Sequence, residues 1–170
     1  MIILSLGSNL PSEIGDRFEN INYAIRMLST HGFSIIKKSC FYETPSYPDQ
    51  SNPKFINVVI SVKNHKSLAS LNYLIKTIFN IEEVLGRKRN KKNDPRTCDI
   101  DIIDYENKVL DFSIDKIKII IPHEKLNNRN FVLIPLQEIY PNWKHPKTKE
   151  YIYQIIKNLS DIDKKSILKI

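Results

Sequence analysis

The sequence predicts an α+β protein with a ferredoxin-like βαββαβ core and an additional C-terminal strand and helices. Short segments rich in β-branched residues alternate with two longer segments whose apolar residues recur at helical spacing. Their order is strand, helix, strand, strand, helix, strand, which places two helices on one face of an antiparallel sheet. The 170 residues, 41% of them hydrophobic, suffice for one core, so we expect residues 1–170 to form a single domain.

The first strand and helix have clear start and stop signals. Residues 2–6 form an apolar run, and the turn residues at 7–9 predict that the strand ends there. Asp16 and Glu19 have the spacing of a capping box. Apolar residues then recur at helical spacing as far as Gly32, which predicts the first helix.

The middle of the core contains two strands and a second helix. Residues 33–42 and 55–63 are rich in β-branched and aromatic residues, and the turn-rich stretch 44–53 predicts a long loop between them. Ser67 is a candidate N-cap for a helix that ends at Gly86, because glycine is frequent just after a helix C-terminus.

The last part of the chain adds further elements to this core. We expect the fourth core strand to begin near Cys98 and another strand to cover residues 116–121. Residues 128–140 predict a helix interrupted by Pro135, and residues 148–159 a terminal amphipathic helix.

Composition narrows the class of protein without identifying a reaction. The formal net charge of +7 favours an anionic partner, which could be nucleic acid, a membrane surface or a phosphorylated small molecule. The sequence shows neither a signal peptide nor an apolar run long enough to span a membrane, so we expect a cytoplasmic protein. Cys40 and Cys98 are isolated, and we expect both to be reduced and packed rather than in a disulfide or zinc site.

Two aspartates are the strongest chemical signal. Asp99 and Asp101 alternate with isoleucines, and on a strand this spacing places both carboxylates on one face, roughly 7 Å apart. Such a pair can hold one or two Mg²⁺ ions against the phosphates of a nucleotide. The alternative is an edge strand with two solvated aspartates.

Basic residues surround this pair in the sequence. The cationic stretch 87–96 directly precedes it and could bind phosphates, although a run of charge is also typical of a solvated surface. His123 and Arg129 lie near a predicted helix start and could reach phosphate as well, while His123 could equally be a structural histidine. Neither a P-loop nor a dinucleotide-binding glycine motif is present.

An aromatic and amide pair could accommodate a flat heterocycle. Thr44 and Pro45 lie in the predicted loop, and Phe55 and Asn57 share one face of the following strand. The alternative places Phe55 in the core and leaves Asn57 as an ordinary polar residue.

In these motifs the chain resembles the 6-hydroxymethyl-7,8-dihydropterin pyrophosphokinases of folate biosynthesis. The most specific match is Pro-Arg-Thr-Cys-Asp-Ile-Asp at residues 95–101, together with Pro-His at 122–123 and Arg-Asn-Phe-Val-Leu at 129–133. Further matching segments are residues 6–9, 41–45, 55–57, 81–82 and 86–89. The resemblance implies transfer of the terminal pyrophosphate of ATP to the pterin hydroxymethyl group, with ATP as co-substrate and two Mg²⁺ ions.

The resemblance also implies roles for individual residues. Catalytic roles fall on Arg87, Arg96, Asp99 and Asp101, of which Asp99 and Asp101 would hold the metal ions. ATP binding falls on Glu82, Arg89, Arg96, His123 and Arg129. Pterin binding falls on Thr44, Pro45, Phe55, Asn57 and Phe131, with the pterin ring between Phe55 and Phe131.

The chain departs from the family pattern in one loop and at two single positions. Residues 92–94 are Lys-Asn-Asp where Arg-Trp-Gly is frequent, so we expect weaker or differently timed closure of this loop. Phe79 stands where some members have a polar residue, and Asn130 where glycine is common.

Two other functions compete with this interpretation. A ferredoxin-like RNA-binding domain would suit the basic loop, but its RNP1-like strand is absent and the aspartates would repel a phosphate backbone. A degenerate family member retained as a partner-binding module would bind ATP without turnover. We expect a monomer that acts on ATP and the pterin, with no nucleic acid and no membrane as partner.

Overall fold

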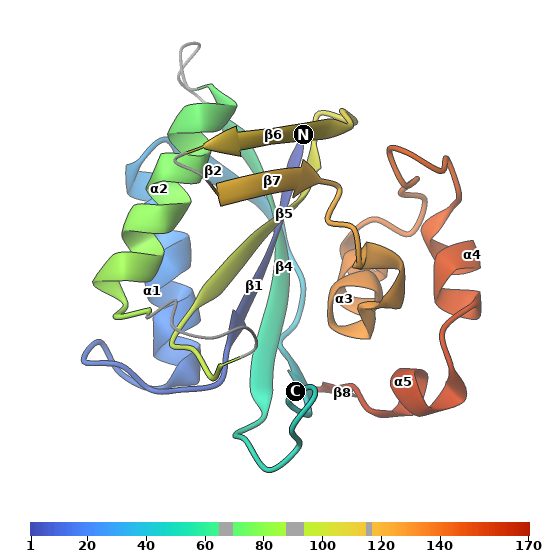
Figure 1. Ribbon diagram of the computed structural model, residues 1–170, viewed down its shortest axis with the longest axis horizontal. Helices are drawn as coiled ribbons and strands as arrows, with labels where there is room; N and C mark the ends of the chain where they lie inside the picture. The colour runs from blue at the N-terminus through green and yellow to red at the C-terminus, as the bar shows by residue number, and fades with distance from the viewer. Residues whose placement is uncertain (65–69, 88–93, 115–116) are drawn as a thin grey trace.

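The computed structural model describes residues 1–64, 70–87, 94–114 and 117–170 (Figure 1). The strands are β1 (Ile2–Ser8), β2 (Phe33–Lys38), β3 (Tyr42–Thr44), β4 (Phe55–Asn64), β5 (Asp99–Tyr105), β6 (Leu110–Ile114), β7 (Ile117–Ile121) and β8 (Leu168–Lys169). The helices are α1 (Arg17–Thr30), α2 (Leu71–Val84), the 3₁₀ helix η1 (Leu126–Asn128), α3 (Asn130–Ile139), α4 (Ile152–Lys157) and α5 (Asp161–Lys165). In these described parts, no helix is long and apolar enough to cross a bilayer.

The main sheet has the strand order β5-β1-β4-β3-β8, with β2 also paired to β4, and these pairings are antiparallel. β2 and β3 together occupy the place of one core strand, so the sheet confirms the predicted α+β class and its ferredoxin-like core. Gly7 of β1 pairs with Asn57 on one side and with Asp99 on the other. This register places residues from two distant parts of the chain on the same face of the sheet.

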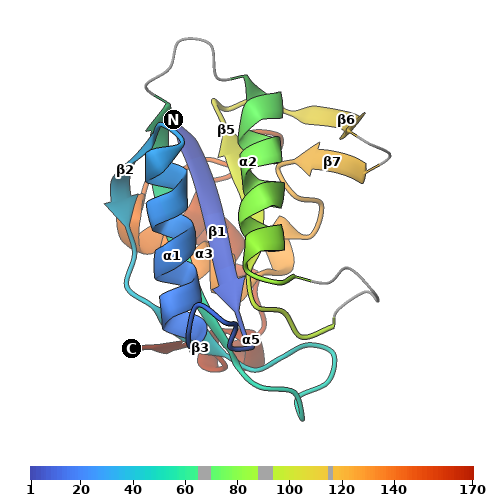
Figure 2. The same cartoon turned by 90° about the vertical axis from the view of Figure 1, so that its left-hand side faces the viewer.

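Helices cover both faces of the sheet. α1 and α2 lie on one face, and α3 and α4 lie on the other (Figures 1 and 2). Successive side chains of β1 point to opposite faces of the sheet and pack against both helical layers. Leu4 packs in the core beneath α1 and α2, while Ile3 packs with α3. The central strands are therefore buried on both sides.

Caps define the ends of the two core helices. Asp16 and Glu19 form the predicted capping box of α1. Ser70 caps α2 by accepting a hydrogen bond from Tyr73, whereas Ser67, the residue we expected in this role, lies outside the described residues. Gly86 follows α2 with a positive φ of 76°, as predicted for the residue after a helix end.

Several predicted boundaries in the first half were wrong. β1 continues to Ser8 instead of ending before Gly7, because it pairs with β4 as far as Ser8 and with β5 as far as Gly7. The strand expected over residues 33–42 is split into β2 and β3. Ser39 lies at the break, where its hydroxyl accepts a hydrogen bond from Val59 N at 3.0 Å. Cys98 is buried as expected, but Cys40 is exposed; both are free thiols.

The C-terminal predictions needed more correction. Pro135 lies inside α3 without interrupting it, since buried neighbours such as Val132 and Leu136 hold the helix against the sheet. The helix expected over residues 148–159 is limited to α4. The expected strand at 116–121 is β7, and its hairpin partner β6 was missed although its alternating apolar residues are a strand signal.

Candidate active site

The two aspartates of β5 lie on one face of the strand, as predicted. Asp99 pairs with Gly7 and Asp101 with Ser5, while Ile100 between them is buried on the opposite face. The side chains of Asp99 and Asp101 are 26% and 30% exposed, so both carboxylates reach solvent. Each of them is nevertheless bound by arginine, which distinguishes them from an ordinary pair of solvated aspartates.

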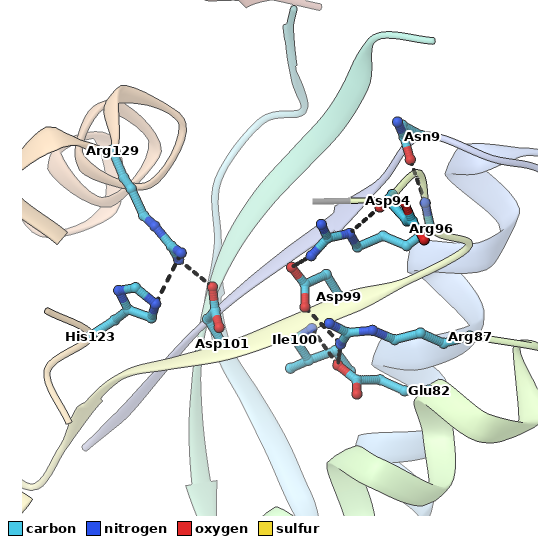
Figure 3. Close-up of polar contacts among 10 residues, drawn as sticks. All are labelled: Asn9, Glu82, Arg87, Asp94, Arg96, Asp99, Ile100, Asp101, His123 and Arg129. Carbon is cyan, nitrogen blue, oxygen red and sulfur yellow. Dashed lines mark hydrogen bonds and ion pairs between the residues drawn. The ribbon is translucent and has the colours of Figure 1, made fainter. Parts of the chain in front are cut away.

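Arg87 and Arg96 bind the two oxygens of Asp99 (Figure 3). Arg87 Nη1 lies 2.7 Å from Asp99 Oδ1, and Arg96 Nη1 lies 2.8 Å from Oδ2. Arg87 also forms an ion pair with the buried carboxylate of Glu82. Burial acts to lower the pKa of Arg87, but the nearby carboxylates of Asp99 and Glu82 outweigh it and raise this pKa.

Glu82 connects α2 to the acidic strand. Its Oε1 accepts a hydrogen bond from Ile100 N at 2.9 Å in addition to its ion pair with Arg87. The side chain is only 3% exposed. Glu82 therefore orients Arg87 and fixes the start of β5 at the same time.

Asp101 belongs to a second polar group that includes α3 and the loop before it. Arg129, at the start of α3, forms an ion pair with Asp101, and its Nη2 lies 3.0 Å from His123 Nε2 (Figure 3). His123 Nδ1 accepts a hydrogen bond from Lys125 N at 3.0 Å. Partial burial, together with the positive charge of Arg129, lowers the pKa of His123 despite the opposing effect of Asp101.

Asn9 positions Arg96, and the sequence analysis gave it no role. The Arg96 backbone N donates to Asn9 Oδ1 at 2.7 Å (Figure 3), and Asn9 N donates to Arg96 O at 3.0 Å. Asn9 Nδ2 donates in turn to Ser46 Oγ and Pro53 O. Asn9 thus joins the loop before β5 to the loop between β3 and β4. Its place in the turn at residues 7–9 was the available signal.

The residues predicted to bind a heterocycle lie beside this acidic strand. Asn57 is buried, and its Nδ2 donates to Thr44 Oγ1 at 2.9 Å. A Cβ on Gly7 would stand 3.2 Å from Asn57 Oδ1, so glycine makes room for this amide. Phe55 pairs with Thr44 across the strands, and half-buried Pro45 follows Thr44 in the chain.

Each of the two predicted stacking rings has an arginine near it. Arg96 Cζ lies 5.9 Å from the ring centroid of Phe55, and Arg129 Cζ lies 5.6 Å from that of Phe131. The arginines that bind the aspartates therefore also border the rings.

A cavity of about 220 Å³ adjoins the aspartates between α2, β5 and β7. Aliphatic and aromatic side chains, including Ile75, Phe79 and Ile119, form one wall. Its charged side chains are those of Glu82, Arg87, Asp99, Asp101 and Lys118, and the imidazole of His123 also lines it. The cavity therefore combines an apolar lining with charged side chains of both signs. The contribution of β7 to the cavity was not predicted from the sequence.

The structure thus brings together most of the predicted site residues. Arg89 is the exception, because it lies outside the described residues. The described parts of the chain hold no cluster of three or more His, Cys, Asp or Glu side chains that could bind a metal ion. A divalent cation held by Asp99 and Asp101 would complete its coordination with water or with oxygens of a substrate.

An antiparallel sheet flanked by helices, with two carboxylates on one strand, arginines around them and an adjoining cavity, is an arrangement typical of phosphoryl-transfer proteins. The family model described as 7,8-dihydro-6-hydroxymethylpterin-pyrophosphokinase matches residues 3–141. The chain belongs to this family. The assignment confirms the predicted resemblance and replaces the RNA-binding alternative.

Individual relatives agree with this assignment. A 2-amino-4-hydroxy-6-hydroxymethyldihydropteridine pyrophosphokinase of Aquifex aeolicus is 37% identical over 145 residues, which cover 85% of this chain and 83% of the relative. A folate synthesis bifunctional protein of Arabidopsis thaliana is 36% identical over 141 residues, covering 81% of this chain. The chain spans only 26% of that bifunctional protein's length.

A solved structure shares the fold. The crystal structure of wild-type Plasmodium falciparum HPPK-DHPS has a TM-score of 0.74 and 16% identity, covering 99% of this chain and 48% of the other.

Proposed function

We propose that the chain transfers pyrophosphate from ATP to the hydroxymethyl group of 6-hydroxymethyl-7,8-dihydropterin, giving AMP and the pterin diphosphate in folate biosynthesis. The observation that carries this proposal is the face of β5, where Asp99 and Asp101 are each bound by arginine in a member of the pyrophosphokinase family. Relatives named 2-amino-4-hydroxy-6-hydroxymethyldihydropteridine pyrophosphokinase align with most of the chain, and their name supports the same reaction.

The donor set of β5 suits magnesium. Asp99 and Asp101 present partly exposed carboxylate oxygens on one face, and Mg²⁺ prefers a few carboxylates completed by water and phosphate oxygens. Asp99 and Asp101 would hold the metal, and we propose two ions. When bound, Mg²⁺ neutralises phosphate charge and makes a coordinated hydroxyl easier to deprotonate.

The arginines supply the phosphate contacts. Arg87, Arg96 and Arg129 each direct a guanidinium at a carboxylate of β5. A guanidinium binds phosphate in the same forked geometry as carboxylate, so an incoming triphosphate competes with the aspartates for these groups. The exchange transfers positive charge to the phosphates and releases the carboxylates for the cation.

The remaining predicted residues divide between the two substrates. We assign ATP binding to Glu82, Arg89, Arg96, His123 and Arg129, with Glu82 acting through its hold on Arg87. We assign the pterin to Thr44, Pro45, Phe55, Asn57 and Phe131. The ring would stack between Phe55 and Phe131 while the Asn57 amide, which Thr44 orients, binds its polar edge.

Two features of the whole chain complete the proposal. Residues 1–170 form one domain, since α3 and α4 share a core cluster with Ile3, Val59 and Ile103 of the sheet. The protein acts as a monomer in the cytoplasm on small-molecule substrates, without nucleic acid or membrane as a partner.

Product analysis tests the reaction directly. The protein is mixed with ATP, Mg²⁺ and 6-hydroxymethyl-7,8-dihydropterin, and the products are identified by phosphorus NMR. AMP that forms only with pterin and Mg²⁺ present supports pyrophosphoryl transfer. ADP would indicate ordinary kinase or ATPase chemistry, and binding of ATP without any turnover would favour the partner-binding module instead.

A further inference from the structure

Residues 160–170, here named the strap, run from the α3 layer back to the edge of the sheet (Figure 1). They include α5 and β8 and lie outside the part of the chain that the family model matches. α5 has no buried residue, and both residues of β8 are exposed. Polar and backbone contacts therefore hold the strap in place, rather than a hydrophobic core.

Asn130 makes the main contact between the strap and α3. Its Nδ2 donates to Asp163 O at 2.6 Å and to Ser166 Oγ at 2.9 Å. Its Oδ1 accepts from Phe131 N at 2.7 Å. The side chain is thus engaged through both its nitrogen and its oxygen, and Asn130 is only 8% exposed.

The position of Asn130 relates this contact to the active site. It stands between Arg129, which binds Asp101, and Phe131, which we assign to the pterin. The other end of α3 also has anchors outside the strap, because Lys37 Nζ donates to Ile139 O at 2.9 Å and the hydroxyls of Tyr140 and Ser61 share a hydrogen bond of 2.9 Å. The end of α3 that carries Arg129 and Phe131 is the one that the strap holds through Asn130.

The strap also reaches the opposite side of the site. β8 pairs with β3, with Lys169 opposite Tyr42 and Leu168 opposite Glu43. Ile170 N donates to Phe41 O at 3.0 Å. β3 is three residues long and ends at Thr44, which orients Asn57. One short segment therefore contacts both elements that flank the predicted pterin site.

A carboxylate links the strap to α3 and β3 together. Glu138 of α3 accepts from Lys169 Nζ at 3.0 Å and from Tyr42 OH at 3.0 Å. Partial burial acts to raise the pKa of Glu138, but hydrogen bonds from Cys40, Lys169 and Tyr42 lower it, so the carboxylate stays ionised at neutral pH.

We propose that Asn130 is a positioning residue for the pterin site, and that the strap sets the distance between Phe131 on α3 and Thr44 on β3. This inference rests on the proposed function. Loss of the Asn130 contacts frees the first turn of α3, so Phe131 and Arg129 lose their fixed orientation while the core beneath α3 stays packed.

Three variants test this proposal. Asn130→Ala removes both donor contacts, and Ser166→Ala removes one of them. Ser70→Ala is the matched control, because it deletes the N-cap of α2 and lowers stability without touching α3. For each we would measure the thermal midpoint, KM and kcat, and the dissociation constant for the pterin from fluorescence.

We expect roughly a tenfold rise in the KM and dissociation constant for the pterin in Asn130→Ala, and about threefold in Ser166→Ala. The control should lower the thermal midpoint and leave both constants unchanged. In the wild-type protein, pterin with a non-hydrolysable ATP analogue should slow hydrogen exchange of the strap amides, because coupling between two sites is reciprocal.

Either of two results would overturn the proposal. In the first, the KM and the dissociation constant for the pterin in both variants equal those of the control. In the second, the hydrogen-exchange rates of the strap amides do not change when the ligands bind. If Asn130→Ala does not fold, the KM and the dissociation constant for the pterin in Ser166→Ala decide whether the proposal holds. A wild-type protein that binds pterin but forms no AMP would overturn the proposed reaction alone, whereas one that does not bind pterin would overturn both.

Discussion

Replacement of Asp99 by Asn is the sharpest test of the metal assignment. The amide keeps the size of the side chain and removes the charge that Arg87 and Arg96 now bind at 2.7 and 2.8 Å. It also removes the anionic metal ligand that we propose at this position. A cation that stabilises the phosphates contributes several kcal/mol, so Asp99→Asn should slow AMP formation by about 10³-fold, or about 4 kcal/mol.

The effect on folding should be much smaller. Asp99 is 26% exposed, so solvent weakens its two ion pairs, and we assign each about 0.5–1 kcal/mol. Less repulsion from Asp101 and Glu82 offsets part of this loss. The free energy of unfolding should therefore fall by less than about 2 kcal/mol and the thermal midpoint by less than about 8 °C. Because domains have about 5–15 kcal/mol of stability, the variant remains folded.

The assay is AMP release with saturating ATP, Mg²⁺ and pterin, with the thermal midpoint measured on the same samples. Glu106→Gln is the matched control, since it neutralises a carboxylate that pairs with Lys108 on the surface. The control should keep wild-type turnover. AMP release by Asp99→Asn within tenfold of the wild-type rate would refute the metal-binding role of Asp99.

Three further predictions concern the pterin site and the pH dependence of stability. Phe131→Ala should weaken pterin binding by about 1–3 kcal/mol in fluorescence titration and leave ATP affinity nearly unchanged; an unaltered pterin affinity would contradict the stacking role. Gly7→Ala should raise KM for the pterin several-fold, because its Cβ would press on the Asn57 amide 3.2 Å away, and steady-state kinetics with unchanged KM would disprove this. Burial lowers the pKa of His145, whose Nδ1 accepts from Lys147 N. As the pH falls, the unfolded chain therefore protonates His145 before the folded protein does. Denaturant titrations should show the full free energy of unfolding above about pH 6.5 and a decrease as the pH falls below it. A pKa of His145 at or above 6.5, measured by NMR titration of the folded protein, would rule this explanation out.

Local sequence signals correctly predicted the first helix and the shared face of the two β5 aspartates. The capping box at Asp16 and Glu19 is a contact between near neighbours, so its spacing alone reveals it. The same holds for Asp99 and Asp101, because alternation along a strand decides which side chains share a face. Family motifs then extended the prediction to Arg96, which the structure places on Asp99.

Predictions failed where distant residues decide the local structure. Pro135 is a helix breaker by intrinsic preference, yet burial of Val132 and Leu136 keeps α3 continuous. The strand break near Ser39 depends on its pairing with Val59, and spacing along the chain does not reveal this pairing. Local propensity is worth little per residue compared with the burial of a side chain.

The sequence by itself determined the family, because the aspartates, the arginines and the motif at residues 95–101 stand in adjacent positions. Only the tertiary structure decided which arginine binds which aspartate. Arg129 reaches Asp101 because α3 covers the same face of the sheet, and Asn9 reaches Arg96 because β1 pairs with β5. Hydrogen bonds and ion pairs act over a few ångströms in space, so folding, and not order along the chain, determines which groups meet.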